Sequence, residues 1–169
     1  MIILITGGSG SGKSALAESL VPRLAAGRRI YLATMAASGG ESLQRIGRHR
    51  RQRASLGMET AERSADLDGL EVPEGALVLL EDVPNWLAGE MFGGGDAARM
   101  LPALRRLAGR CRHLILVTGD VFRDGGRYDA ETERYLETLA VINREAAAPA
   151  DAVCEVVCGI PVMLKGKLP

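Results

Sequence analysis

The sequence predicts an α/β fold in which helices flank a mostly parallel central sheet. Short apolar runs typical of buried strands alternate along the chain with segments that favour helices. The first of these runs leads directly into a glycine-rich loop and then into a helix-forming segment. With 169 residues, 47% of them apolar, the chain has the size and composition of one domain with a sizeable core. We therefore expect residues 1–169 to form a single domain.

Strands are expected where short apolar runs are bounded by polar or glycine-containing segments. The runs lie at residues 2–6, 29–34, 77–80, 114–118 and 152–157. Gly159-Ile160-Pro161 interrupts the last of them, because proline cannot donate to a strand ladder. We expect the chain to return after this break as a short terminal strand over residues 162–164.

Helices are expected between the strands, at residues 13–25, 41–57, 97–110 and 130–148. Glycine clusters at residues 39–40, 93–95 and 124–126 are typical of loops. Because strands and helices alternate in this way, the pattern favours a parallel sheet covered by helices.

The first loop has the sequence GGSGSGKS, from Gly7 to Ser14. Two glycines five residues apart, followed by Lys13 and Ser14, form the phosphate-loop pattern, in which backbone N–H groups converge on a polyphosphate. These N–H groups are expected from Gly7, Gly8, Ser9, Gly10, Ser11 and Gly12. Lys13 would reach the β- and γ-phosphates, and the Ser14 hydroxyl would ligate Mg²⁺. A flexible Gly/Ser linker would instead have polar flanks, so the sequence predicts a three-layer, P-loop NTPase-like fold that binds a polyphosphate.

A carboxylate that supports the metal is expected at the end of a buried strand. Glu81 and Asp82 directly follow the apolar run at residues 77–80, and Asp120 follows the run at residues 114–118. We favour Glu81, with Asp82 as the close alternative. Either acid could instead cap a helix or lie in solvent.

A basic segment at residues 41–53 forms a second candidate for phosphate contact. In a helix Arg45, His49 and Arg53 would share one face at positions i, i+4 and i+8. The three side chains would face phosphate, and a histidine among guanidinium groups can act as a nucleophile toward phosphorus. The neighbouring side chains Arg48, Arg50 and Arg51 could contact RNA or simply be solvated. His113 opens an apolar run without basic neighbours, and we interpret it as structural.

Composition argues against several other classes of protein. The formal charge is zero and aromatic residues make up 4%, so no overall field or stacking surface for nucleic acid is expected. The first apolar run is too short for a signal peptide and has no charged segment before it, and no run approaches a membrane span. We therefore expect small-molecule partners and a cytoplasmic location.

The three cysteines are Cys111, Cys154 and Cys158, an odd number without the C-x-x-C spacing. This arrangement disfavours a disulfide framework and a zinc site. We expect buried thiols, with Cys154 and Cys158 on one face of a strand.

Several stretches together resemble one enzyme family, the bifunctional adenosylcobinamide kinase/adenosylcobinamide-phosphate guanylyltransferases of cobalamin biosynthesis. They are MIILITGGSGSGKSALAESL, IYLAT, RIGRHRRQR with Thr60 and Glu62 downstream, LVLLED followed by Trp86, and AVCEVVCGIPVMLK. The phosphate loop alone is common to many families. The pattern R-I-x-x-H-x-x-x-R after Y-L-A-T, and the ending G-I-P-x-x-x-K, are specific to this one.

The resemblance implies a role for each matching position. Residues 7–14 match the family's nucleotide-binding loop, Glu81 its metal-supporting acid, and His49 the histidine that becomes covalently guanylylated. Arg45, Arg53 and Glu62 are expected beside the nucleotide. The family phosphorylates the hydroxyl of the aminopropanol side chain of adenosylcobinamide with ATP or GTP. It then transfers GMP from GTP through a histidine–GMP phosphoramidate, which gives adenosyl-GDP-cobinamide and pyrophosphate.

The chain also departs from the family pattern. Gly119-Asp120-Val121-Phe122 stands where the family has Asn-Glu-Val-Gly, and GGRYDAE replaces the Gly-Ile-Val-Pro that follows. Met58, Pro84 and Gly89 replace the family's Trp, Thr and Asn, whereas Arg134 and Asn143 match. Two alternatives therefore stay open, a divergent P-loop kinase or nucleotidyltransferase with one activity and a nucleotide-binding regulatory module. The resemblance also suggests a homo-oligomer, possibly a trimer, with active sites at subunit boundaries.

Overall fold

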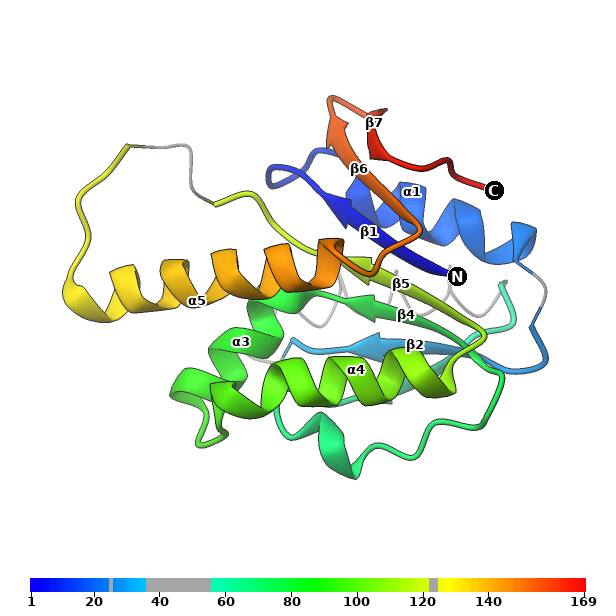
Figure 1. Cartoon of the computed structure of the whole chain (residues 1–169), viewed down its shortest axis with the longest axis horizontal. Coiled ribbons are helices and arrows are strands. Elements are labelled where there is room, and N and C mark those ends of the chain that lie inside the picture. Colours follow the sequence, from blue (N-terminus) through cyan, green and yellow to red (C-terminus); the bar gives the residue numbers. More distant parts are fainter. Residues whose placement is uncertain (25, 36–55, 122–124) are drawn as a thin grey trace, which may run out of the picture.

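The computed structural model describes residues 1–24, 26–35, 56–121 and 125–169. These residues form a three-layer α/β fold around one seven-stranded sheet, with the strand order β3-β2-β4-β5-β1-β6-β7 (Figure 1). The α/β fold class predicted from the sequence is confirmed. Most of the helix expected at residues 41–57 lies outside the described residues, and its last two positions form a turn.

Six strands run parallel and the seventh is antiparallel to its neighbour. They are β1 (Ile2–Thr6), β2 (Arg29–Ala33), β3 (Glu59–Glu62), β4 (Leu77–Glu81), β5 (His113–Val117), β6 (Ala152–Val157) and β7 (Ile160–Lys165). Every expected strand is present, and β7 begins two residues earlier than predicted because Pro161 lies at the edge of the sheet. Strand β3 was not predicted, since its sequence ETAE is polar and three of its four side chains are exposed.

The helices are α1 (Lys13–Leu20), α3 (Val83–Phe92), α4 (Met100–Arg110) and α5 (Ala130–Ala147). Short 3-10 turns at Val21–Arg23, Leu67–Gly69 and Ala97–Arg99 connect or extend them. Helix α1 ends earlier than expected because Pro22 has no N–H to donate to the carbonyl four residues before it. Helix α3 was not predicted, although Asp82 at its N-cap and Pro84 in its first turn are typical signals of a helix start.

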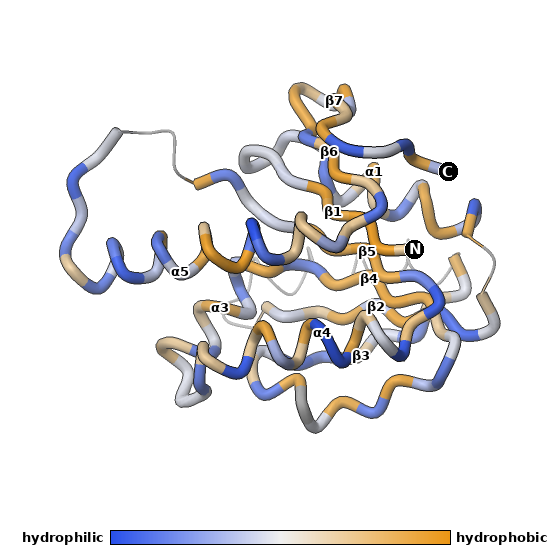
Figure 2. The backbone as a smooth tube through the Cα atoms, in the orientation of Figure 1, coloured by the Kyte–Doolittle hydropathy of each residue, from blue (hydrophilic) through white to orange (hydrophobic). Residues whose placement is uncertain are grey.

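The two faces of the sheet are covered by different helices, because side chains alternate between the faces along each strand. Ile3 and Ile5 of β1 pack with Ala17 and Leu20 of α1 on one face. Leu4 packs on the other face, in the cluster that includes buried residues of α3, α4 and α5. In Figure 1, α1 lies above β1, β5 and β4, and α4 lies below these strands, while Figure 2 shows apolar residues concentrated on the strands between the two helices.

Strand β1 lies at the point where the strand order of the sheet reverses. It lies between β5 and β6, so the chain leaves β1 toward β2 on one side and later returns to β6 on the other. Open parallel sheets bind ligands at such a switch point, outside the carboxyl ends of the strands. The residues that directly follow β1, from Gly7 onward, are therefore in the expected place for a binding site.

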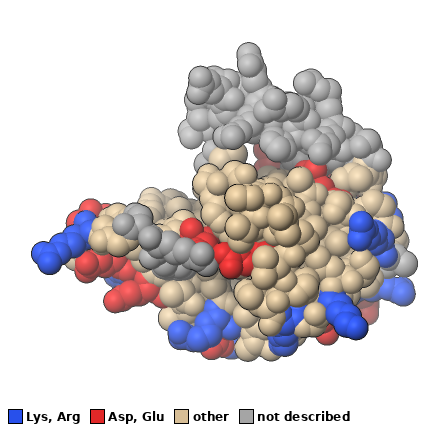
Figure 3. All heavy atoms as spheres, turned by 90° about the horizontal axis from the view of Figure 1, so that it is seen from above, with Lys and Arg blue, Asp and Glu red and all other residues tan. Residues whose placement is uncertain are grey.

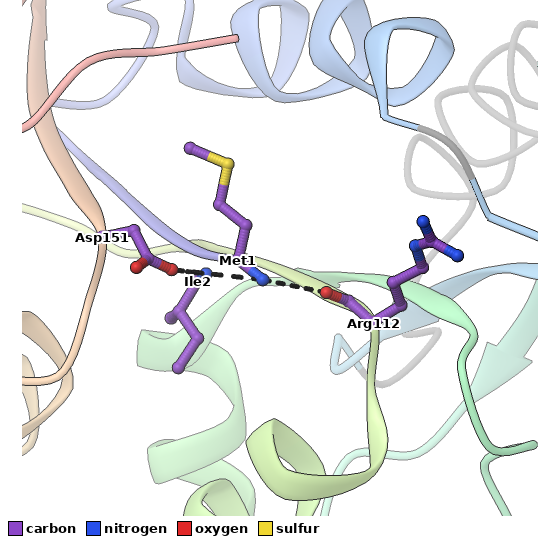
Figure 4. A network of polar contacts seen from close by, with 4 residues as sticks. All are labelled: Met1, Ile2, Arg112 and Asp151. Atoms are coloured by element: carbon purple, nitrogen blue, oxygen red, sulfur yellow. Dashed lines mark hydrogen bonds and ion pairs between the residues drawn. The ribbon is translucent and has the colours of Figure 1, made fainter.

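Polar contacts hold the start of β1 at the amino ends of the parallel strands, away from the glycine-rich loop (Figure 4). The Ile2 amide donates a hydrogen bond of 2.6 Å to Oδ2 of Asp151 in the segment before β6. The Met1 nitrogen donates to the Arg112 carbonyl at 2.8 Å, immediately before β5. These contacts fix the register of β1 between its two neighbours.

The cysteines only partly follow the sequence expectation. Cys154 is buried in β6 and Cys111 is half-buried after α4. Cys158 is exposed, so the expectation of a buried thiol on the same strand face is wrong for this residue. Cys158 and Gly159 form the tight turn between β6 and β7, where both residues have positive φ angles.

Among the described residues, no helix is long and apolar enough to cross a membrane.

Candidate active site

The loop after β1 approaches β6 and the β6–β7 turn closely at two of its glycines, Gly7 and Gly12. Gly7 has a φ of 143°, and a Cβ atom there would lie 2.5 Å from the carbonyl oxygen of Val156. Gly12 has a φ of 100°, and its Cβ atom would lie 3.3 Å from the Cα atom of Gly159. The amide of Gly159 in turn donates to the Ser11 carbonyl at 2.8 Å. Both ends of the loop are thus fixed against the last two strands.

The loop leads directly into α1 and borders a cavity of about 290 Å³. The cavity is lined by Gly10, Ser11, Gly12, Lys13, Ser14, Ala15 and Glu18. The first N–H groups of a helix have no partner within the helix and attract anions. A cavity at the start of α1 is therefore suited to a phosphate group.

Lys13 bends back over this loop, and its Nζ donates to the Gly8 carbonyl at 2.7 Å. Burial lowers the pKa of Lys13, and the charges of Asp82 and Glu81 oppose that shift. The ammonium group is thus held on a backbone oxygen that a phosphate oxygen could replace.

Glu81 lies beside the loop although β5 separates its strand from β1. The Ser14 hydroxyl donates to Oε1 of Glu81, and the Tyr31 hydroxyl donates to Oε2 at 2.9 Å. Hydroxyl and carboxylate oxygens are ligands that Mg²⁺ prefers, and Mg²⁺ in such sites commonly takes only one or two protein carboxylates. Ser14 and Glu81 therefore fit a magnesium ion held together with phosphate oxygens.

Asp82 has a different environment from Glu81. Its Oδ1 accepts a hydrogen bond of 2.7 Å from the Asn85 amide at the start of α3, so it is the N-cap of that helix. Its own amide donates to Oγ1 of Thr34 at 2.7 Å, and the same hydroxyl donates to its carbonyl at 2.6 Å. The peptide bond between Glu81 and Asp82 is cis. Burial raises the pKa of Asp82, and the capping bonds from Asn85 oppose that shift. Of the two alternatives considered, Asp82 is the helix cap and Glu81 contacts the loop.

The third acid considered, Asp120, also lies next to the loop. Its amide donates to the Gly7 carbonyl at 3.2 Å, just beyond the end of β5. The hydroxyl of Thr118 donates to Oδ1 of Asn143 at 2.6 Å, which ties the end of β5 to α5. The carboxyl ends of β1, β4 and β5 thus bring the loop, Glu81 and Asp120 to one edge of the sheet.

The remaining predicted site residues are Glu62 and three residues that the structure does not describe. Arg45, His49 and Arg53 lie outside the described residues, as does Phe122. Glu62 is the last residue of β3, the edge strand four positions from β1. At about 4.8 Å per strand, this places it roughly 19 Å away along the sheet.

Sequence reasoning did not identify two hydroxyl groups that contact the acid pair, one within β2 and one directly after it. Tyr31 contacts the Glu81 carboxylate and Thr34 contacts the Asp82 backbone. The available signal was the presence of these two polar groups within the apolar stretch IYLAT. That signal alone does not indicate which strand lies beside β2, so it could not assign their partners.

Comparison with known proteins agrees with this geometry. Residues 3–164 match the model of the family described as cobinamide kinase / cobinamide phosphate guanyltransferase. The chain is 31% identical to the bifunctional adenosylcobalamin biosynthesis protein CobU of Escherichia coli (strain K12), over 98% of this chain and all of that protein. It is 30% identical to the protein of the same name from Salmonella typhimurium, with the same coverage.

Solved structures with low sequence identity share the fold. The flagellar accessory protein FlaH from Methanocaldococcus jannaschii has a TM-score of 0.58 at 12% identity, covering 98% of this chain and 78% of that chain. A prototypical ATPase from the type III secretion system of pathogenic bacteria has a TM-score of 0.50 at 11% identity, covering 96% and 56%. These similarities support a three-layer P-loop fold. Together with the family match over nearly the whole length, they show that the chain belongs to the cobinamide kinase / cobinamide phosphate guanyltransferase family of transferases.

Proposed function

We propose that this protein phosphorylates adenosylcobinamide with ATP or GTP and then transfers GMP from GTP to the product, as a step of cobalamin biosynthesis. The observation that carries the proposal is the contact between Ser14 and Glu81 beneath the glycine loop, in a chain of this family. A phosphate loop with a metal-supporting acid is the arrangement that phosphoryl transfer requires.

In the first reaction the loop holds the triphosphate and the substrate supplies the nucleophile. Backbone amides of residues 7–12 would bind the phosphates, and Lys13 would leave the Gly8 carbonyl to contact the β- and γ-phosphates. Ser14 and Glu81 would hold Mg²⁺, which when bound neutralises charge on the β- and γ-phosphate oxygens. The acceptor hydroxyl forms a bond to the γ-phosphorus and passes its proton to solvent, while the bond from that phosphorus to the departing nucleoside diphosphate breaks.

In the second reaction His49 is proposed to be the nucleophile. Its neutral imidazole would bond to the α-phosphorus of GTP as pyrophosphate leaves, and the phosphate of the first product would then displace the imidazole. Arg45 or Arg53 would clamp the α-phosphate. The sequence pattern and the family support this role. The chain also leaves β2 through Thr34, which is hydrogen-bonded to Asp82 at the edge that carries the loop. One loop would hold the triphosphate in both steps. Whether the γ- or the α-phosphorus reacts would therefore depend on which nucleophile lies in line with the bond that breaks.

A divergent enzyme with only one of these activities is the second candidate. The observation that favours it is Gly89, where a Cβ atom would lie 1.8 Å from the Ser64 carbonyl oxygen. The resemblance places an Asn at this position in the family, so the segment after β3 packs against α3 where family members carry a side chain. That difference lies in α3, whose N-cap is Asp82.

We further propose that residues 1–169 act as one nucleotide-binding domain in the cytoplasm, within a homo-oligomer such as a trimer. The exposed strand β7 supports self-association. The large apolar side chains Ile160, Val162, Met163 and Leu164 are each at least 39% exposed along it. A strand with such an exposed apolar surface at a sheet edge is a site at which another chain can pack.

The first reaction is tested with γ-labelled ATP or GTP, Mg²⁺ and adenosylcobinamide, with product separation by chromatography. We expect label on the corrinoid with the wild type and a loss of about 10²–10³-fold in rate with Lys13→Ala, because the charge stabilises the transition state. Lys167→Ala, at an exposed position outside the site, serves as the control. Transfer by Lys13→Ala at the wild-type rate would remove the loop from the mechanism. No transfer by the wild type would overturn the substrate assignment.

A further inference from the structure

Tyr31 places a phenol hydroxyl against the carboxylate at the metal-supporting position. The side chain is 7% exposed and packs in the apolar cluster between the sheet and α1. Its hydroxyl donates to Oε2 of Glu81 at 2.9 Å, while Ser14 donates to Oε1 of the same group. Each oxygen of this carboxylate therefore has a hydrogen-bond donor on a different element, β2 and α1.

The pairing of β2 with β4 explains why these groups meet. Tyr31 lies opposite Leu79 and Ala33 lies opposite Glu81, so Glu81 is the diagonal neighbour of Tyr31 on the same face. Such diagonal pairs are within reach of long aromatic side chains. The backbone of β2 thus fixes where the phenol hydroxyl lies relative to the carboxylate.

We propose that Tyr31 is a positioning residue that holds the Glu81 carboxylate in the orientation in which it supports Mg²⁺ and Ser14. The proposal rests on the proposed function and deepens it. Glu81 has single bonds about which its carboxylate can turn, and one hydrogen bond to Ser14 leaves that rotation open. The second hydrogen bond, from Tyr31, restricts this rotation, so that the carboxylate is ordered before the nucleotide and metal bind.

The proposal separates metal support from nucleotide binding. The loop amides and Lys13 bind the phosphates without any contact to Tyr31, so the affinity measured without metal depends on them alone. Loss of the Tyr31 hydroxyl would leave Oε2 without this donor and allow the carboxylate to turn away from Ser14. The consequence is a higher Mg²⁺ requirement with unchanged binding of the metal-free nucleotide.

The test compares Tyr31→Phe with Tyr135→Phe. The hydroxyl of Tyr135 also makes one hydrogen bond at this edge of the sheet, but to the Pro84 carbonyl at 3.0 Å. Calorimetry measures the affinity for a non-hydrolysable GTP analogue over a series of Mg²⁺ concentrations and in EDTA. We expect Tyr31→Phe to raise the Mg²⁺ concentration for half-maximal binding about five- to tenfold, a factor within the usual range for one lost hydrogen bond. We expect Tyr135→Phe to match the wild type, and all three proteins to bind equally in EDTA.

A second comparison separates positioning from a structural role. In a Glu81→Gln background, Tyr31→Phe should add less than twofold to the Mg²⁺ requirement, because the group it orients is already lost. Equal Mg²⁺ curves for Tyr31→Phe and the wild type would overturn the proposal, as would equal effects in both backgrounds. Weaker binding in EDTA together with a lower melting temperature would assign Tyr31 to the core instead. Because the analogue binds without corrinoid, a Mg²⁺ shift with no transfer to adenosylcobinamide would sink the proposed function while this inference stands.

Discussion

At the scale of single residues, the adjacent acids Glu81 and Asp82 have different partners because β4 ends directly before helix α3. Glu81 is the last residue of β4 and contacts Ser14, whereas Asp82 caps α3. We expect Glu81→Gln to raise the Mg²⁺ requirement and slow phosphoryl transfer more than Asp82→Asn does. Asparagine is as good an N-cap as aspartate, so Asp82→Asn should also change the free energy of unfolding little. Steady-state kinetics over a Mg²⁺ series checks the ranking, and the reverse order would assign the metal to Asp82.

The cysteines give a prediction about pH. Burial raises the pKa of the Cys111 thiol to about 11, so at pH 8 only about one molecule in a thousand carries the reactive thiolate. Cys158 is exposed in the β6–β7 turn. Iodoacetamide labelling followed by mass spectrometry should modify Cys158 first, and the rate at Cys111 should rise about tenfold per pH unit up to its pKa. Rapid labelling of Cys111 at pH 8 would contradict the burial that the structure gives it.

The sequence indicates candidate site residues where the pattern is contiguous along the chain. Residues 7–14 form one stretch, and Glu81 directly follows an apolar run, so both could be proposed without knowing the fold. Tyr31 and Thr34 could not, because their partners lie fifty and forty-eight residues away and depend on β2 pairing with β4. Hydrogen bonds between strands depend on strand order, which the sequence pattern alone does not determine.

At the scale of elements, the buried carboxylate of Glu90 joins three segments. It accepts hydrogen bonds from the Asp66 amide at 2.7 Å, from Nε1 of Trp86 at 2.9 Å and from the Asp96 amide at 2.8 Å. The side chain is 4% exposed on α3, and its three partners are N–H donors. This one carboxylate therefore fixes the segment after β3 and the loop before α4 against α3.

Glu90→Gln should destabilise the fold, because the new amide group would face N–H donors that need an acceptor. We expect the free energy of unfolding to fall by about 1–3 kcal/mol, the usual cost of an unsatisfied buried polar group. Glu71→Gln, at an exposed position, should leave it within about 0.5 kcal/mol of the wild type. Urea denaturation followed by circular dichroism measures both. Equal midpoints for the two variants would show that the three donors find other partners.

Helix α3 and strand β3 mark where element prediction failed. Strand β3 has no apolar run, since it is an edge strand whose side chains face solvent. Its place is set by backbone pairing with β2 rather than by burial. Helix α3 follows β4 after a single residue, Asp82, and the apolar stretch that contains both has no glycine to separate them. The longer helices and the buried strands were predictable because their apolar residues recur with the period of the element.

At the scale of the whole molecule, the sheet is closed by helices on both faces and remains open at β7. Figure 3 shows a broad area of uncharged atoms in the middle of the face seen from above, the side on which β7 lies uppermost in Figure 1. Ile160 and Leu164 of β7 are 66% and 60% exposed. Both lie on this edge strand, which pairs with β6. We propose this surface as the contact for another copy of the chain.

Replacing both residues with lysine should weaken self-association, because charge at a sheet edge opposes packing against another apolar surface. We expect sedimentation velocity to find an oligomer for the wild type at micromolar concentration and a shift toward monomer for Ile160→Lys/Leu164→Lys. Val141→Lys changes an exposed apolar residue of α5 and should leave the distribution unchanged. A monomeric wild type, or an oligomer that survives the double substitution, would move the interface elsewhere.

The central claim is that one phosphate loop serves two transfers and that His49 carries the guanylyl group between them. The most direct measurement is incubation with α-labelled GTP and Mg²⁺, followed by denaturing electrophoresis. We expect label on the wild-type chain that is stable to base and released by acid, as a phosphorus–nitrogen bond requires. Lys13→Ala and His49→Ala should acquire none, while His49→Ala should still transfer the γ-phosphate to adenosylcobinamide. A wild-type chain that stays unlabelled while it transfers the γ-phosphate would contradict the claim and leave the protein a kinase.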